Sequence, residues 1–164
     1  MNTKRLFVLA LTLALVLAAS AATLAFADEA VVPFKAYYAG VPVGVFDPGC
    51  GCIHQTFEFD GNATHLGLSH MSAQGNAYPY PPPIQQIGDM VLTAADGDEL
   101  YVHYEGTAVY LSQTLVEFDG DFSFEGGTGR FLDVTGEGIY WGSASVAPSP
   151  DPWGKIYFDG TLYK

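Results

Sequence analysis

The chain has 164 residues, with six Lys and Arg against 18 Asp and Glu, so its formal net charge is −12. Such an acidic surface argues against nucleic acid and anionic lipid as partners, because both repel it. The length fits one domain of ordinary size with a single core.

Residues 1–27 form a predicted signal peptide. Lys4 and Arg5 give a basic start, an apolar run from Leu6 to Leu17 follows, and Ala25-Phe26-Ala27 has the small-x-small form of a cleavage site. The apolar run is too short for a membrane anchor, so we expect no membrane span after cleavage. Residues 28–164 are therefore expected to be a single exported domain, secreted or located in a periplasmic or extracellular space.

Short runs of alternating apolar and polar residues recur along the rest of the chain, each bounded by Gly, Pro, Asn or Asp. Such runs predict β-strands with one buried face. We predict eight strands: Phe34 to Val45, Ile53 to Asp60, Ala63 to Ala73, Ile87 to Ala95, Glu99 to Leu111, Leu115 to Glu125, Thr135 to Val146 and Lys155 to Tyr163. A single long strand bent at Gly61 is the alternative for the second and third.

Eight strands in a chain of this size predict an all-β fold, an eight-stranded antiparallel up-and-down β-barrel, because closure removes the exposed edges of an open sheet. Ala95-Asp96-Gly97-Asp98 predicts a hairpin turn. The proline-rich segments 78–83 and 147–152 are predicted to be loops, since proline cannot join a central ladder. Phe-Asp-Gly occurs at 59–61, 118–120 and 158–160, where glycine gives a strand room to curve.

Cys50-Gly51-Cys52 lies on a predicted loop tip after Asp47-Pro48-Gly49. In an exported protein, Cys50 and Cys52 would be expected to form a disulfide that closes a small strained ring. A loop staple, a thiol-exchange centre and a metal or intermolecular pairing site are the three interpretations. The Cys-x-Cys spacing is not the more familiar redox spacing, and two cysteines alone make a poor zinc site.

The run from Glu99 to Leu111 has one apolar and one polar face, and the polar face contains Tyr101, His103 and Glu105. Ordinary burial preference places the apolar face inside the barrel. If the polar face lined the interior instead, burial would raise the pKa of Glu105 and give it general-acid character. Tyr101, His103 and Glu105 are the catalytic candidates that the sequence offers.

The remaining polar residues show no pattern typical of a metal or cofactor site. The four histidines lack a short ligand spacing such as His-x-His, and the acidic clusters do not continue into a calcium-binding loop. We therefore expect neither a metal nor a cofactor.

Gly126-Gly127-Thr128-Gly129-Arg130-Phe131 lies between two predicted strands. Its three glycines can supply the positive φ angles and the close backbone approach that a sharp reversal needs. A phosphate-binding loop is the alternative, but the Lys-Ser/Thr of such a loop is missing and no helical pattern follows. We predict a structural turn, with Phe131 and Leu132 packed against the end of the core.

Four blocks of the chain resemble the bacterial secreted branch of the allene oxide cyclase and dirigent barrel superfamily. They span nearly all of the chain after the signal peptide: Pro33-Phe34-Lys35-Ala36, Gly61-Asn62-Ala63-Thr64-His65-Leu66-Gly67, Leu92-Thr93-Ala94-Ala95-Asp96-Gly97-Asp98, and the glycine-rich block followed by Thr135-Gly136. The resemblance implies an eight-stranded barrel, associated as dimers or trimers, whose interior holds a small apolar molecule. Plant members either cyclise an oxylipin epoxide or guide the radical coupling of phenols without an oxidative centre. Their substrate-handling residues have no alignable positions here, so no catalytic residue is implied.

The expected function is therefore that of an exported barrel that binds or steers a small, mainly apolar molecule in its interior. One alternative is a cofactor-free cyclase or isomerase with a polar Tyr, His or Glu lining. The other is a filled barrel that serves as an extracellular interaction domain. A small apolar ligand and further copies of the chain are the partners that the resemblance implies.

Overall fold

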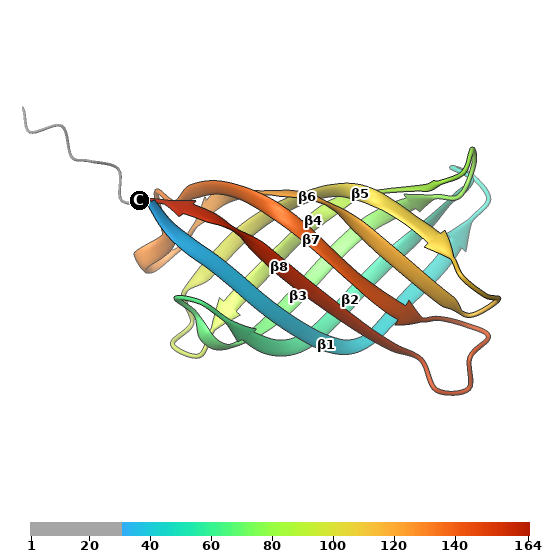
Figure 1. Cartoon of the computed structure of the whole chain (residues 1–164), viewed down its shortest axis with the longest axis horizontal. Coiled ribbons are helices and arrows are strands. Elements are labelled where there is room, and N and C mark those ends of the chain that lie inside the picture. The colour runs from blue at the N-terminus through green and yellow to red at the C-terminus, as the bar shows by residue number, and fades with distance from the viewer. Residues whose placement is uncertain (1–30) are drawn as a thin grey trace, which may run out of the picture.

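Eight antiparallel strands form a closed barrel in the computed structural model, which describes residues 31–164 (Figure 1). The predicted signal peptide lies outside the described residues. The strands are β1 (Val31–Asp47), β2 (Cys52–Ala63), β3 (Gly67–Tyr78), β4 (Ile84–Ala94), β5 (Glu99–Tyr110), β6 (Leu115–Gly127), β7 (Thr135–Ser145) and β8 (Trp153–Tyr163). Each strand pairs with its neighbours in sequence, and β1 pairs with β8. The predicted up-and-down barrel is confirmed.

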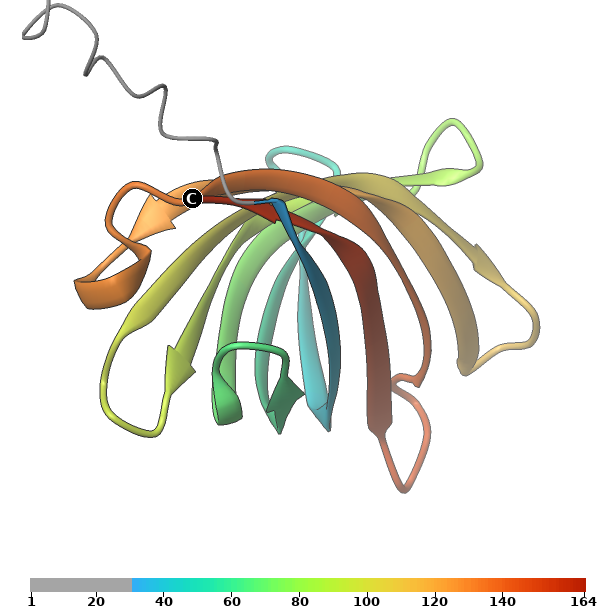
Figure 2. The same cartoon turned by 60° about the vertical axis from the view of Figure 1, so that its left-hand side comes forward.

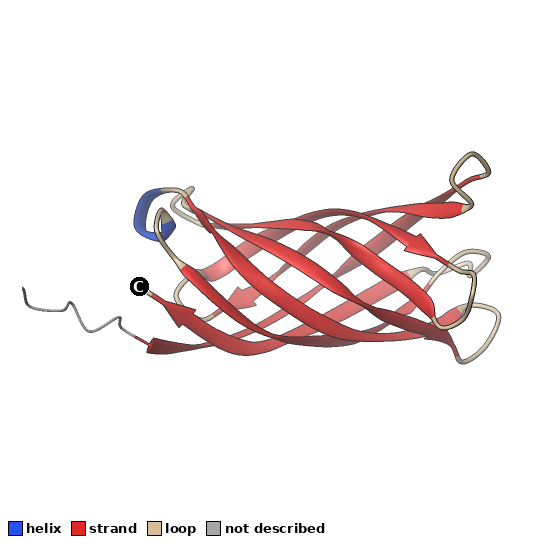
Figure 3. Cartoon of the chain, turned by 90° about the horizontal axis from the view of Figure 1, so that it is seen from above, coloured by secondary structure: helices blue, strands red, loops and turns tan. Residues whose placement is uncertain are grey.

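The connections gather at two ends of the barrel (Figure 3). The first, called here the η1 end, carries the turns 64–66 and 95–98 and the β6–β7 connection with the 3-10 helix η1 (Gly129–Phe131). The second, called the disulfide end, carries the loops 48–51, 79–83, 111–114 and 146–152. Within residues 31–164, no helix is long and apolar enough to cross a membrane.

The β2–β3 reversal lies three residues later than the sequence predicts, and β2 and β3 are separate strands. Gly61 stays inside β2, where a side chain would meet the Tyr38 ring, because an added Cβ would lie 2.6 Å from Tyr38 Cδ1. The chain reverses instead around His65 and Gly67, which both have a φ of 70°. The glycine that was expected to bend the strand therefore serves the close approach of an aromatic ring.

Glycines also face each other across three strand pairs: Gly75 and Gly88 in β3–β4, Gly106 and Gly120 in β5–β6, and Gly138 and Gly160 in β7–β8. One inward-pointing ring lies over each pair, from Tyr104, Tyr140 and Phe122 respectively. An added Cβ would lie 2.7 Å from the Tyr104 hydroxyl at Gly88 and 2.8 Å from the Phe122 ring at Gly160. The barrel thus accommodates large rings because the wall beneath them carries no side chains.

Candidate functional site

The strands curve around the barrel interior (Figure 2). Apolar side chains fill this interior from the η1 end to its middle, and a small cavity lies beyond them. Phe131 and Leu66 are buried at the η1 end of the main core. A second apolar cluster lies toward the disulfide end, made of Ala77, Ile84, Ala108 and Val116. The cavity between them has a volume of about 40 Å³.

Most side chains that line this cavity are apolar, and three are polar. The apolar group includes Phe59, Phe118, Met71 and Met90, together with small residues of β7 and β8, and the polar side chains are Gln86, Tyr104 and Tyr140. Gln86 is buried and donates a hydrogen bond from Nε2 to Gln55 Oε1 at 3.3 Å. Its amide is therefore partly satisfied within the protein.

The hydroxyls of Tyr104 and Tyr140 are buried and have no hydrogen-bond partner among the described residues. Their rings pack edge to face, with centroids 5.7 Å apart and planes at 85°. Burial raises the pKa of Tyr104 to about 12 and raises that of Tyr140 as well. Both side chains are therefore neutral near pH 7, and each has one hydroxyl proton that no acceptor among the described residues satisfies.

The cavity is small in this conformation. At roughly 10–15 Å³ per water, it holds a few water molecules, whereas an apolar cavity that binds benzene measures about 150 Å³. Met71 and Met90 are the flexible side chains of the lining, since methionine has three rotatable bonds and adapts its shape readily. A guest with a ring would therefore require these two side chains to move.

The three catalytic candidates from the sequence, Tyr101, His103 and Glu105, lie on the outer face of β5 rather than in the cavity. Glu105 has 69 % of its side chain exposed, so the buried general acid considered above is not formed. Tyr101 donates a hydrogen bond from its hydroxyl to Glu99 at 3.0 Å. The cyclase alternative required Tyr101, His103 and Glu105 to line the interior, and none of the three does so.

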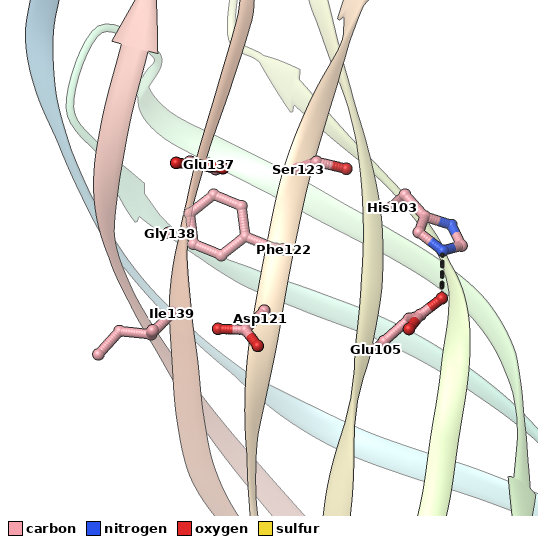
Figure 4. A pocket seen from close by; sticks show the side chains of 8 residues that line it. All are labelled: His103, Glu105, Asp121, Phe122, Ser123, Glu137, Gly138 and Ile139. Atoms are coloured by element: carbon pink, nitrogen blue, oxygen red, sulfur yellow. Dashed lines mark ion pairs between the residues drawn. The ribbon is translucent and has the colours of Figure 1, made fainter.

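His103 lies beside an open groove on the outer surface of β5, β6 and β7 (Figure 4). Its Nδ1 is 2.8 Å from the Asp89 carboxylate, and its Nε2 is 3.5 Å from that of Glu105. The hydrogen bond with Asp89 contributes most to raising the pKa of His103. Asp121 and Glu137 also line the groove and are exposed. No titratable residue of the groove has the burial typical of a catalytic acid or base.

Cys50 and Cys52 are joined by a disulfide at the disulfide end, with their Cα atoms 5.2 Å apart. One ring nitrogen of His54 and both sulfurs lie within 4.8 Å of one another. With the two sulfurs bonded to each other, neither is a thiolate that could bind a metal.

The structure places Gly126-Gly127-Thr128-Gly129-Arg130-Phe131 at the β6–β7 reversal, in the position of the predicted turn. Gly126 and Gly129 have φ angles of 87° and 53°, in the left-handed region that favours glycine. Gly127 has no such angle, but an added Cβ there would lie 2.9 Å from Phe131 Cβ. Phe131 is fully buried in the core, as predicted. The prediction for Leu132 is wrong, because 66 % of this residue is exposed to solvent.

Tyr104 and Tyr140 were not among the site residues inferred from the sequence. The available signal was weak, because each is an aromatic residue at an inward position of an apolar strand face. A tyrosine there differs from phenylalanine only by a hydroxyl, and the strand pattern does not reveal whether that hydroxyl finds a partner.

No family model and no curated protein matches the chain. Among solved structures, the pterocarpan synthase dirigent protein PsPTS1 is similar, with a TM-score of 0.54 and 17% identity over 84% of this chain and 97% of that one. The pterocarpan synthase dirigent protein GePTS1 has a TM-score of 0.49 and 16% identity over 85% of this chain and 93% of its own. At this identity the likeness is one of fold: this chain and PsPTS1 have similar β-barrels.

Proposed function

We propose that the barrel binds one small, mainly apolar molecule in the cavity beneath Tyr104 and Tyr140, and that it orients this molecule rather than transforming it. The observation that carries the proposal is the pair of buried hydroxyls without partners in a mostly apolar lining, whose third polar side chain, Gln86, is partly satisfied within the protein. A buried polar group without a hydrogen bond costs about 1–3 kcal/mol. A hydroxyl or carbonyl oxygen of a guest would recover that free energy, while its apolar body replaces water against Phe59 and Phe118.

The composition of the lining supports binding over acid–base catalysis. No Asp, Glu, His, Lys or Arg is among the described residues that line the cavity. The tyrosines are the titratable groups there, and burial raises the pKa of each far above neutral pH. A general acid or base works best with a pKa near the working pH, which neither tyrosine has.

The similarity in fold to PsPTS1, which is described as a dirigent protein, supports a role in orienting a molecule. PsPTS1 is also described as a pterocarpan synthase, so the preference for orientation over transformation rests on the composition of the cavity lining. For the present chain we propose a ring compound with one or two oxygen atoms, because the lining combines aromatic side chains with two unpartnered hydroxyls. We also propose that residues 1–27 direct export, so that the barrel meets its guest outside the cytoplasm.

Binding to one- and two-ring phenols and ketones tests the proposal, with the thermal midpoint and isothermal titration calorimetry as readouts. We expect saturable binding of one molecule per barrel to the wild-type protein. The double variant Tyr104→Phe/Tyr140→Phe should bind at least about tenfold more weakly, because a lost hydrogen bond of ~1.4 kcal/mol changes a dissociation constant by that factor.

Tyr101→Phe is the matched control, since this tyrosine lies on the outer face of the strand that carries Tyr104. It should bind as the wild type does. Met90→Ala should widen the cavity and favour the larger compounds. Equal binding by the double variant and the wild type would exclude the tyrosine site, and the absence of binding to any compound, including by Met90→Ala, would favour a filled barrel.

A further inference from the structure

The β1–β2 loop at the disulfide end exposes one cysteine and buries the other. Cys50 is exposed, whereas Cys52 is only 1 % exposed. Apart from its two chain neighbours, Gly51 has no atom within 4 Å of the place where its Cβ would lie. Because Cys50 is exposed and Cys52 is buried, an external thiol can reach Cys50 and not Cys52.

His54 lies beside the two sulfurs, with both of its ring nitrogens held by oxygen acceptors. Nδ1 is 2.6 Å from Asn76 Oδ1, and Nε2 is 3.2 Å from Asp47 Oδ2. Only the protonated imidazolium can donate from both nitrogens. The hydrogen bond with Asp47 is also the first cause that raises the pKa of His54. A positive charge within 4.8 Å of a sulfur stabilises a thiolate there.

The surroundings of the loop also suit the reduced form. The Cys52 N–H donates to Cys50 Sγ at 3.2 Å, an interaction that stabilises a thiolate on Cys50. Cys50 Sγ is 3.6 Å from the Asp47 carbonyl oxygen, and Cys52 Sγ is 4.0 Å from Asn76 Oδ1. After reduction these oxygens can accept hydrogen bonds from the two thiols. Both redox states therefore fit the loop.

We propose that the Cys50–Cys52 disulfide is a thiol–disulfide exchange site that oxidises a dithiol substrate, such as a peptide with two nearby cysteines, and that His54 assists the departure of Cys52. This activity is separate from binding in the barrel interior.

The exchange proceeds in two displacements. A substrate thiolate attacks Cys50 Sγ, the bond to Cys52 breaks, and its electron pair leaves on Cys52 Sγ as a thiolate beside His54. The second substrate thiolate then attacks the substrate sulfur of the mixed disulfide and releases Cys50. The two protons given up by the substrate thiols are taken up by Cys50 and Cys52. The substrate loses two electrons and gains a disulfide, and the protein gains two thiols.

Reduction of the folded protein by dithiothreitol, followed by alkylation and mass spectrometry, tests the site. We expect the disulfide to open and to close again with oxidised dithiothreitol while the circular dichroism spectrum stays that of the folded barrel. In the single-cysteine variants, oxidised glutathione should form a mixed disulfide readily with Cys50 in Cys52→Ser and slowly with Cys52 in Cys50→Ser. A disulfide that opens only when the barrel unfolds, or equal trapping by both variants, would overturn the proposal.

The role of His54 is tested by the rate of opening. His54→Gln should slow reduction by dithiothreitol roughly tenfold, because a nearby positive charge lowers the pKa of the departing thiol by about 1–3 units and a lower pKa speeds departure. His54→Lys should restore part of the rate, since it returns a positive charge. His70→Gln is the matched control, as His70 is also bound to carboxylates on the outer face. Equal rates for His54→Gln and His70→Gln would exclude assistance by His54.

Discussion

The guanidinium group of Arg130 lies 2.8 Å from the carboxylate of Asp98 and also contacts that of Asp96. Its Nη2 donates a hydrogen bond to the carbonyl oxygen of His65 at 3.3 Å. One side chain of the β6–β7 connection thus joins the β4–β5 and β2–β3 turns at the η1 end. Residues of the segments 61–67, 92–98 and 126–131 therefore meet at this point and close the η1 end.

Replacing Arg130 with Gln should lower the thermal midpoint by about 3–6 °C, since it removes charge-assisted hydrogen bonds to two turns at once. Lys35→Gln is the control, because Lys35 makes a single exposed ion pair with Asp159 at 2.9 Å. It should change the midpoint by less than about 2 °C. The decrease in thermal midpoint caused by Arg130→Gln should be smaller in 1 M NaCl. Equal decreases for Arg130→Gln and Lys35→Gln would show that the contacts of Arg130 with the two turns add no stability.

The barrel could be predicted from the sequence because the alternation of apolar and polar residues and the turn residues are local signals. Closure of the eight strands then leaves no exposed sheet edge. The contacts of Arg130 could not be predicted, because they join turns that are far apart in the sequence. Which glycines face each other depends on the strand register, which the sequence does not show. The Phe-Asp-Gly tripeptides therefore indicated bends, whereas Gly61 and Gly160 make room for the rings of Tyr38 and Phe122. The cavity was beyond prediction because its volume depends on how Met71 and Met90 fill the space.

Gly120→Ala should destabilise the barrel by roughly 1–3 kcal/mol through overpacking. An added Cβ would lie 2.6 Å from Gly106 Cα and 2.7 Å from Tyr140 Cε1. Gly44→Ala is the control, because its added Cβ would meet only the Ile53 side chain, at 3.0 Å, and it should cost less than about 1 kcal/mol. Urea unfolding measures both. A Gly120→Ala protein as stable as Gly44→Ala would contradict the close packing of rings over the glycine pairs.

Three histidines on the outer face should make stability depend on pH. They are hydrogen-bonded to carboxylates: His54 to Asp47, His70 to Asp60 and Glu58, and His103 to Asp89. In each case the hydrogen bond to an Asp contributes most to raising the pKa of the imidazole. A histidine whose pKa is higher in the folded than in the unfolded state stabilises the barrel when it is protonated. This stabilisation is complete below the unfolded-state pKa of about 6.5 and is lost as the pH rises through the folded-state pKa.

The carboxylates act in the opposite direction at low pH. The hydrogen bond with His70 lowers the pKa of Glu58. Ionised Glu58 therefore stabilises the folded state when the pH is above the ordinary pKa of a glutamate, and this stabilisation is lost as the pH falls. The urea midpoint should therefore be highest between about pH 5 and 6.5 and lower at pH 8 and pH 3. His70→Gln should flatten the decline between pH 6 and 8, and a wild-type midpoint that rises over that interval would refute this account.

Tyr38 and Tyr104 provide a paired test of whether the cavity hydroxyls lack partners. Burial raises the pKa of each to about 12, but the Tyr38 hydroxyl is 2.8 Å from Ser69 Oγ, whereas that of Tyr104 has no partner in the described chain. Tyr38→Phe should therefore lower the free energy of unfolding by about 1 kcal/mol, while Tyr104→Phe should leave it unchanged or raise it by a similar amount.

The comparison of these two variants in urea bears directly on the proposed function. If Tyr104→Phe is the more stable protein without a guest and the weaker binder with one, the unpartnered hydroxyl lowers stability in the empty barrel and serves binding in the filled one. If Tyr104→Phe instead loses as much stability as Tyr38→Phe, ordered water already satisfies the hydroxyl in the empty barrel. A guest oxygen would then have to displace that water and would gain little from the tyrosine, which removes the physical basis for binding at this site.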